Sequence, residues 1–441
     1  MRNVLLFSFL AFSFIGNGQI INFPDANFKN ALVNTKCVST NGSSGGEIDA
    51  DLNNDGEIDV SEALMVMDLE IDSALIYNLD GLEYFKNLKS LRCYNNKISR
   101  IDITPFNGLT SLHCENNLIE EIVVGNISPL RFLNCDNNLL ESISLINTPN
   151  LVWLDCDKNK LSELKVDHLK NLTTLECNYN KITSINVKGL TSLINFQCFN
   201  NQLDTLDIEE LLNLTLVICA KNNIKHLNVG NHPFLKNLTC SDNKISKLYV
   251  NSCPKLESVF ANSNIIEEID FTGNPNLIDL FIQNNKLKSL HLSNNNNLNR
   301  IDCSDNEISD LKLHNLPNLK SLSCSNNFIN ELNVKDANNL ENLYCQKNNF
   351  SSIDVSQFNL LKNLNCDLNT SLNSLFIKTG GRFLNLNFQD CPSLNFICCN
   401  EYETYDIKSK VNMYGLLNCV VNSYCSFTPG GKYYILNGEV K

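Results

Sequence analysis

The 441-residue sequence lacks the features that mark several common classes of protein. It has no excess of basic residues: 35 lysines and arginines stand against 48 acidic residues, a formal charge of −13, whereas a nucleic-acid surface needs a basic patch. Beyond the first residues, no apolar run approaches the length of a transmembrane helix. No H-E-x-x-H, P-loop or G-x-G-x-x-G motif is present. We therefore expect no catalytic residue, no nucleic-acid partner and no transmembrane segment.

The chain also lacks the cysteine density of a small disulfide scaffold, although its 19 cysteines exceed what a cytosolic enzyme usually carries. A hydrophobic content of 43% excludes wholesale disorder. The length exceeds what one hydrophobic core usually supports. The chain is therefore either several domains or a repeat array, and the spacing of the cysteines has to decide between them.

The first residues have the pattern of a secretory signal. Arg2 supplies a positive charge, residues 4–15 are an apolar run, and small or polar residues follow as far as Gly18. The apolar run is too short to span a membrane. We predict a signal peptide over residues 1–18 and an exported protein, either secreted or on the outer cell surface.

The cysteines recur with a fixed 21-residue period. They occupy positions 93, 114, 135, 156, 177, 198, 219, 240, 303, 324, 345 and 366, and Ala261 and Ile282 fill the two missing places. We call this the ladder position. In all 14 repeats a leucine stands five residues before it (Leu88 to Leu361) and an asparagine three residues after it (Asn96 to Asn369). The unit is L-x-x-L-x-C-x-x-N-x-I-x-x-I-x-V.

This unit resembles the leucine-rich repeat, and specifically the 21-residue internalin-like repeat with its cysteine ladder. The resemblance implies a solenoid over residues 66–400, with a parallel β-sheet on its concave face and little helix in the repeats. The first coil is centred on Ile71. The last is expected around Cys399, after an insertion of about twelve residues near 378–390, and the repeat before it places Ser371 and Ser374 in apolar columns.

Each coil should contribute one short strand before the ladder position, and the residues eight and ten after it indicate a second extended segment on the opposite side. Neighbouring cysteines would point the same way about 4.8 Å apart, which does not suit a disulfide or a metal site. We therefore predict buried free thiols. The asparagine should satisfy backbone groups of the turn. Of the seven cysteines off the ladder, five crowd the C-terminal end, where a disulfide is plausible.

Residues 51–62 match the calcium loop D-x-[DN]-x-[DN]-G-x5-E at every fixed place. Oxygen-bearing side chains at loop positions 1, 3 and 5 would surround the ion, Gly56 permits the turn, and the final glutamate closes the shell. The alternative is an acidic turn that only resembles such a site. We predict a structural Ca²⁺ in an EF-hand-like N-terminal cap (residues 19–65), with the ligands Asp51, Asn53, Asp55, Glu57, Asp59 and Glu62. A short helix from Asp25 to Val33 should complete the cap.

At the other end, helical character over residues 402–414 predicts a C-terminal cap (residues 401–424). Residues 425–441, with a β-like stretch at 433–436, are interpreted as the start of a truncated following segment.

Outward strand positions carry recurring aromatic and aliphatic residues, which on a strand face suggest an interaction patch. The candidate binding residues are Phe132, Trp153, Phe199, Leu216, Ile218, Phe260, Phe281 and Tyr344. We predict an exported protein that recognises a protein or glycan partner through its concave face. The alternatives are a passive scaffold or spacer of a larger surface protein, or the non-catalytic part of an enzyme truncated at Lys441.

Overall fold

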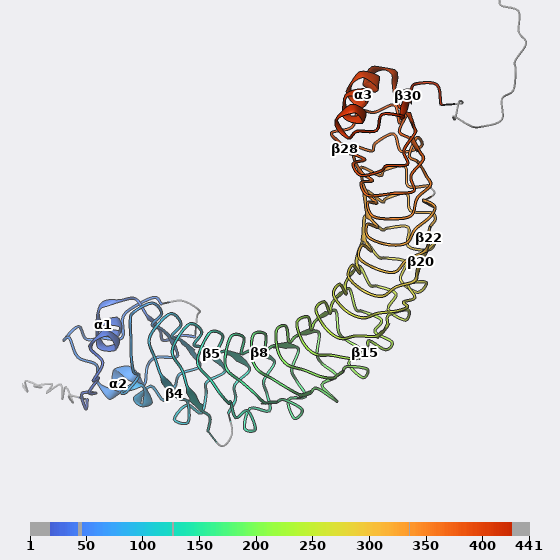
Figure 1. Ribbon diagram of the computed structural model, residues 1–441. Coiled ribbons are helices and arrows are strands. Elements are labelled where there is room, and N and C mark those ends of the chain that lie inside the picture. The colour runs from blue at the N-terminus through green and yellow to red at the C-terminus, as the bar shows by residue number, and fades with distance from the viewer. Residues whose placement is uncertain (1–17, 43–45, 126–127, 335, 426–441) are drawn as a thin grey trace, which may run out of the picture. The chain divides into compact units, whose positions relative to one another are not determined.

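The computed structural model describes residues 18–42, 46–125, 128–334 and 336–425 (Figure 1). The predicted signal lies outside these residues except for Gly18, and so does nearly all of the segment 425–441. The chain forms two compact units, divided between Leu161 and Ser162, and each is described by itself. No helix in the described part of the chain is both long and apolar enough to cross a membrane.

The first unit contains the N-terminal cap and the first coils. The cap holds α1 (Ala26–Asn34), β1 (Val38–Ser39) and α2 (Val60–Ala63). The parallel strands β2 (Asp68–Glu70), β3 (Ser90–Arg92), β5 (Ser111–His113), β7 (Phe132–Asn134) and β8 (Trp153–Asp155) then pair in register, and β1 joins β2 antiparallel. We call the sheet formed by strands that precede ladder positions the ladder sheet. A short 3-10 helix, η1 (Leu82–Tyr84), follows β2.

The ladder sheet of the second unit has the same in-register parallel pairing. Its strands are β10 (Thr174–Glu176), β12 (Asn195–Gln197), β14 (Leu216–Ile218), β16 (Asn237–Thr239), β18 (Ser258–Phe260), β19 (Asp279–Phe281), β21 (Arg300–Asp302), β23 (Ser321–Ser323), β24 (Asn342–Tyr344), β26 (Asn363–Asn365) and β28 (Asn385–Asn387). Each strand is short because the chain must turn within every coil.

The predicted second extended segment is confirmed, and it pairs only over short stretches. The first unit has β4 (Arg100–Asp102) beside β6 (Glu121–Val123). The second unit has four such groups: β9 (Leu164–Lys165) with β11 (Ile185–Asn186); β13 (Leu206–Asp207) with β15 (His226–Asn228) and β17 (Lys247–Tyr249); β20 (Ser289–Leu292) with β22 (Asp310–Leu313); and β25 (Ser352–Asp354) with β27 (Ser374–Phe376), β29 (Phe396–Cys398) and β30 (Val420–Asn422). We call these the second-side strands.

In the core of each unit, side chains at equivalent positions of successive coils are stacked in columns. Every ladder cysteine is at most 1% exposed, and Ala261 and Ile282 are equally buried in the places that lack one. None of the twelve ladder cysteines forms a disulfide. Burial raises the pKa of ladder thiols such as Cys219 and Cys324, for both to about 12, because the thiolate would lose its hydration. The prediction of a column of buried thiols outside any disulfide is confirmed.

The buried asparagine of each repeat joins two coils. Asn117 is typical: its Nδ2 donates to the carbonyl oxygens of Cys93 (2.9 Å) and Cys114 (3.0 Å), and its Oδ1 accepts from the Ile98 N–H (3.0 Å). The side chain therefore satisfies groups of its own coil and of the preceding one. The predicted role of this asparagine is confirmed, and the structure adds that its hydrogen bonds run between coils.

The expected twelve-residue insertion near 378–390 is wrong, because these residues form a complete coil of their own. Strand β28 pairs with β26, so that Asn385 lies beside Asn363 and Phe388 takes the ladder position after a 22-residue step. Cys399 therefore does not lie in the ladder column; it follows β29, which pairs with β27 on the second side. The one-residue shift also places Leu372 and Leu375, rather than Ser371 and Ser374, in the buried columns.

In the same coil, Cys391 takes the place of the buried asparagine. Its Sγ lies 3.4 Å from the Cys366 carbonyl oxygen and 3.6 Å from that of Gln389, the carbonyls that an asparagine would bond there. Both markers of the repeat, the cysteine and the asparagine, are thus replaced in one coil. Because both replacements fall in the same coil, the repeat pattern in the sequence does not identify it.

Both caps contain the helices that the sequence predicts. Asp25 caps α1 by accepting from Asn27 N–H and Phe28 N–H, and its other oxygen accepts from Tyr77 N–H at 2.6 Å in the first coil. At the other end, η2 (Glu401–Glu403) and α3 (Thr404–Met413) follow β29, and the Tyr414 ring packs edge-on against Phe388, 5.1 Å between centroids. A disulfide joins Cys398 to Cys425, which realises the cross-link expected there.

Candidate functional site

The predicted calcium loop is folded so that its first and last ligand side chains, Asp51 and Glu62, turn inward. The Asp51 carboxylate accepts from the N–H groups of Asp55 (3.0 Å) and Gly56 (2.8 Å), and Asn53 Oδ1 also accepts from Asp55 N–H (2.8 Å). Gly56 has φ +85°, a conformation that residues with a side chain rarely adopt. The sharp turn that the sequence pattern requires of this glycine is therefore present.

The far end of the loop closes back on its beginning. Glu62 accepts from Asn53 N–H (3.1 Å) through Oε1 and from Asp59 N–H (2.9 Å) through Oε2, while Asp59 caps the start of α2. Asp51 and Glu62 are only 4% and 6% exposed, so the first and last ligand positions form the floor of the loop. Ile58, the apolar residue between the ligand positions Glu57 and Asp59, is fully buried and anchors the loop to the core.

The donor set fits a hard divalent cation, because carboxylate and amide oxygens at these six loop positions are the ligands that Ca²⁺ prefers. In the part of the chain that the structure describes, no three carboxylates of this loop bring an oxygen each within 4.8 Å of one another. Four of them, Asp51, Asp55, Asp59 and Glu62, accept instead from backbone N–H groups of the loop, and Glu57 forms an ion pair with Lys29 (2.7 Å). Ion binding would accordingly require the Asp55, Asp59 and Glu62 side chains to rotate toward a common centre.

On the ladder sheet of the first unit, the structure brings two predicted binding residues together. Phe132 and Trp153 are register partners on β7 and β8, and both side chains stand on the outward face. The Arg131 guanidinium lies 5.5 Å from the Phe132 ring centroid, and the His113 ring lies 6.2 Å from the Trp153 ring. Burial lowers the pKa of His113, with a smaller contribution from Arg92, so its ring favours the neutral form.

In the second unit, Phe260 and Phe281 form a stacked pair on the ladder sheet. Their rings are nearly parallel (4°), with 5.0 Å between centroids. On the side of the following coil, the Arg300 guanidinium lies 5.6 Å from the Phe281 centroid and is held by a two-pronged ion pair with Asp279 (2.6 and 2.8 Å). We call these four residues the Phe281 cluster. Stacked rings and an oriented guanidinium are typical of energetically important interface residues.

A second cluster surrounds Phe199, beside the ladder sheet of the same unit. The Tyr179 ring meets Phe199 edge-on at 5.1 Å, and the Lys221 ammonium lies 5.4 Å from the Phe199 centroid. Tyr179 (φ 53°) and Lys221 (φ 53°) occupy the position two after the ladder, which is left-handed in every described coil from Asn95 to Asp390. Among residues with a side chain, asparagine and aspartate tolerate this conformation best, so a tyrosine there costs backbone strain. We call these three residues the Phe199 cluster.

The remaining predicted binding residues are more scattered. Leu216 and Ile218 lie on the outward face of β14, one coil after Phe199. Tyr344 shares a column with Phe281, but Asp302 and Ser323 stand between them, about 14 Å of sheet at the usual strand spacing. Sequence reasoning missed Tyr179, Lys221, Arg300 and Asp279. Arg300 and Asp279 could have been predicted, because alternate residues of each strand point outward. Tyr179 and Lys221 could not be found in this way, because they lie in the turn after the strand.

A second asparagine column, six residues before the ladder position, was also missed. Its side chains donate to carbonyl oxygens of the preceding coil, as Asn213 does to Thr191 (2.8 Å) and Asn339 to Pro317 (2.7 Å). This position is asparagine in eight of the 14 repeats. Phe234 and Lys255 occupy it in two consecutive coils, and the Lys255 ammonium lies 4.7 Å from the Phe234 ring centroid. A groove of about 450 Å³, which these two line together with Ile194 and Thr215, opens there on the flank of the second unit.

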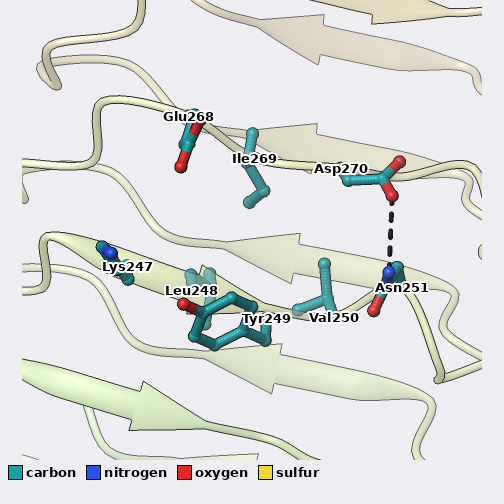
Figure 2. Close-up of a pocket in the computed structure, with 8 residues that line it drawn as sticks. All are labelled: Lys247, Leu248, Tyr249, Val250, Asn251, Glu268, Ile269 and Asp270. Atoms are coloured by element: carbon teal, nitrogen blue, oxygen red, sulfur yellow. Dashed lines mark hydrogen bonds between the residues drawn. The ribbon is translucent and has the colours of Figure 1, made fainter.

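A pocket of about 280 Å³ lies on the second side of the same unit, where β17 has no strand beside it in the following coil (Figure 2). Lys247 and Tyr249 on β17 face Glu268 and Asp270 across a floor of aliphatic side chains, and Asn251 donates to Asp270 at 3.4 Å. Its mixture of one cation and two carboxylates is ordinary for a polar surface, and we assign it no role.

One stretch fits the hydrolase pattern G-x-S-x-G by letter, at residues 42–46. That motif requires a turn from a strand into a helix. Here the stretch connects two antiparallel segments of the cap, because Val38 pairs with Ile48, and residues 43–45 lie outside the described ranges. The match therefore carries no evidence of catalysis.

Comparison with known proteins supports the fold. No protein-family model matches the chain, and no curated protein matches it. Among solved structures, the functional domain of InlJ from Listeria monocytogenes, which includes a cysteine ladder, is 27% identical over 82% of this chain and 77% of its own, with a TM-score of 0.66. The chain has an internalin-like leucine-rich repeat fold.

Two other bacterial structures are similar to it. YopM from Yersinia enterocolitica is 25% identical over 76% of this chain and 78% of its own length, with a TM-score of 0.57. A leucine-rich repeat protein from Leptospira interrogans covers 82% of this chain and 97% of its own at 20% identity and a TM-score of 0.53, a likeness in fold alone. The predicted leucine-rich repeat solenoid with its cysteine ladder and little helix is thereby confirmed.

Proposed function

We propose that this internalin-like chain is an exported, non-enzymatic binding protein, secreted or on the outer cell surface, whose ladder-sheet face recognises a protein partner. The observation that carries the proposal is the Phe281 cluster. It places two aromatic rings and a guanidinium fixed by Asp279 on an outward sheet face, without a hydrogen-bonding task in the core. Such residues dominate binding energy at protein interfaces.

The Phe199 cluster supports the same proposal from a different direction. Its tyrosine occupies a left-handed position that asparagine or glycine would fill with less strain. A residue retained at an energetic cost, with its ring exposed beside another aromatic, favours a role in recognition over one in stability. A glycan partner is the alternative, because aromatic rings also contact sugars.

The proposal is tested by immobilising the purified protein with either the wild-type sequence or the double substitution Trp153→Ala and Phe281→Ala. Captured proteins from the surface of candidate partner cells are identified by mass spectrometry, and an array of defined glycans is tested in parallel. The expected result is a protein retained by the wild type and lost from the double variant.

The matched controls are Phe234→Ala on the flank and Tyr249→Ala on the second side, which remove exposed aromatic rings from other surfaces. Both controls should retain the partner. Equal capture by the wild type and the double variant would refute recognition through the ladder-sheet face and favour a passive scaffold or spacer, or the non-catalytic part of a longer enzyme. Capture of a defined glycan alone would replace the protein partner with a glycan.

We further propose that residues 51–62 bind one structural Ca²⁺ that fastens the cap. The support is the inward-turned loop with Asp51 and Glu62 as its buried floor. Chelation should lower the melting temperature of the wild type, whereas Glu62→Gln should show no response to chelation because it weakens the closing ligand. Glu120→Gln, an exposed acid outside the loop, is the control and should respond like the wild type. Identical melting of wild-type protein with calcium and with chelator would refute the site.

A further inference from the structure

Residues 19–21, at the start of the predicted mature chain, are held to the proposed calcium loop by backbone hydrogen bonds. The Gln19 carbonyl oxygen accepts from Val60 N–H (3.0 Å), Ile20 forms an antiparallel bridge with Asp59, and Ile21 N–H donates to the Ile58 carbonyl (2.9 Å). Residues 19–21 therefore run as a short strand along loop positions eight to ten. The Gln19 side chain itself is exposed.

The pattern of small residues places the cleavage site immediately before this strand. Gly16 and Gly18 stand at the third-last and last positions of the predicted signal, where signal peptidases accept only small residues. Cleavage after Gly18 leaves Gln19 as the first residue. The backbone hydrogen bonds that join residues 19–21 to the loop are retained. This step rests on the export that is part of the proposed function.

We propose that Gln19 is a modification site: after cleavage, its new α-amine closes on its own side-chain amide to form pyroglutamate. The amine nitrogen attacks Cδ, a C–N bond forms, the bond from Cδ to Nε2 breaks, and one ammonia leaves. The reaction needs no oxidant, reductant or second substrate. The product is a five-membered lactam whose nitrogen carries one hydrogen and no charge.

The geometry leaves this reaction unhindered. The backbone bond that holds Gln19 uses its carbonyl oxygen, which ring closure does not consume. The side chain lies at the surface, so it can fold back onto the terminal nitrogen without displacing a core residue. The exposed Ile20 beside it (59% exposed) leaves room for the ring.

Cyclisation also suits the neighbouring loop. A Cβ built on Gly18 would lie 2.6 Å from the Asp59 carboxylate, so the residue that cleavage removes lies against that ligand position and the new terminus follows it directly. A free terminal ammonium would pair with Asp59 and place a positive charge beside a site for a cation. The neutral lactam retains one N–H donor near this position and removes the competing charge.

The test is the intact mass and the N-terminal peptide of the mature protein, exported by a cell that carries the full-length gene. The expected chain begins at residue 19 and is lighter by one ammonia than the unmodified sequence. A chain that begins with an open Gln19 would overturn the modification and leave export standing. A chain that retains residues 1–18 would overturn both.

A second measurement tests the consequence for the loop. Gln19→Ser gives a terminus that cannot cyclise, and its cleavage site is verified in the same mass spectrum. Calcium should bind this variant about three-fold more weakly than the cyclised protein, the size of a typical exposed charge interaction, and the difference should shrink at high salt. Equal calcium affinity would overturn the electrostatic role assigned to the lactam.

Discussion

The buried asparagine three residues after the ladder position is the residue on which each turn depends. Its amide satisfies three carbonyls and one N–H that are otherwise shut off from water, as Asn222 does with the carbonyls of Cys198, Cys219 and Ala220 and the N–H of Leu203. Sequence spacing was sufficient to predict this role, because an invariant polar residue in an apolar frame has to be hydrogen-bonded. The left-handed position just before it was not predicted, since its residues vary in type.

We expect Asn222→Ala to lower the free energy of unfolding by about 2 kcal/mol, because four buried backbone groups lose their partner. Denaturant unfolding followed by circular dichroism measures it. Asn223→Ala, one residue along and half exposed, is the control and should change stability little. A loss no larger in Asn222→Ala than in this control would contradict the role.

The buried thiols predict an alkaline limit to stability. Burial raises the pKa of Cys219 and Cys324 from 9.0 to about 12. The unfolded chain therefore releases protons that the folded chain keeps, so this contribution is complete below pH 9 and is lost as pH rises from 9 toward 12. The melting temperature should fall steeply above pH 9, and less steeply in a Cys219→Ala and Cys324→Ala double variant. The same slope in both proteins would rule out the thiols as its cause.

At the scale of one coil, the structure shows both the strength and the limit of sequence periodicity. Hydrophobic spacing alone predicts the strand positions, the buried columns and the second extended segment, because every coil buries apolar side chains at the same positions. The coil containing Phe388 was misread because it is one residue longer than the regular repeat and replaces both marker residues, with Phe388 for cysteine and Cys391 for asparagine. In that coil, a buried position is filled by a side chain that fits the space and not by the residue type that the repeat pattern specifies. The partners of Phe281 and Phe199 depended on contacts between coils, which a single repeat does not show.

The strained turn position gives a stabilising substitution. Leu368 has φ 60° and is 39% exposed, so its side chain gains little burial in return for an unfavourable backbone. Leu368→Asn should raise the free energy of unfolding by about 1 kcal/mol, measured by thermal melting. Tyr179→Asn should stabilise similarly, and it should also weaken partner capture if the Phe199 cluster binds. A drop in stability for Leu368→Asn would show that the leucine packs more than its exposure indicates.

For the molecule as a whole, the ends differ from the middle because an end coil has core on one side only. The N-terminal end is closed by α1, tied to the first coil through Asp25, and the C-terminal end by α3 and β30. Helices at both ends were predictable from composition. The pairing of Cys398 with Cys425 was not, because connectivity depends on which residues the fold brings together.

The disulfide between Cys398 and Cys425 closes a loop with a sequence separation of 27 residues. Cys425→Ser should destabilise the C-terminal cap by about 3.5 kcal/mol at most, the chain-entropy value for such a loop. Hydrogen exchange should quicken at β30 and α3 while coils near β14 keep their protection. A reducing agent should reproduce the effect in the wild type and leave the variant unchanged. Uniform loss of protection along the chain would contradict a local role.

The buried asparagines have a further consequence for how such a chain can change over generations. The side chain of each one bonds to its own coil and to the coil before it, at separations of 2, 3, 19 and 24 residues in the typical repeat. Deleting or duplicating one whole repeat within a run of regular coils gives every remaining asparagine the same partners as before. A gene that gains or loses a repeat therefore encodes a chain whose coils pack as before. The length of its recognition surface can thus change in single recombination steps.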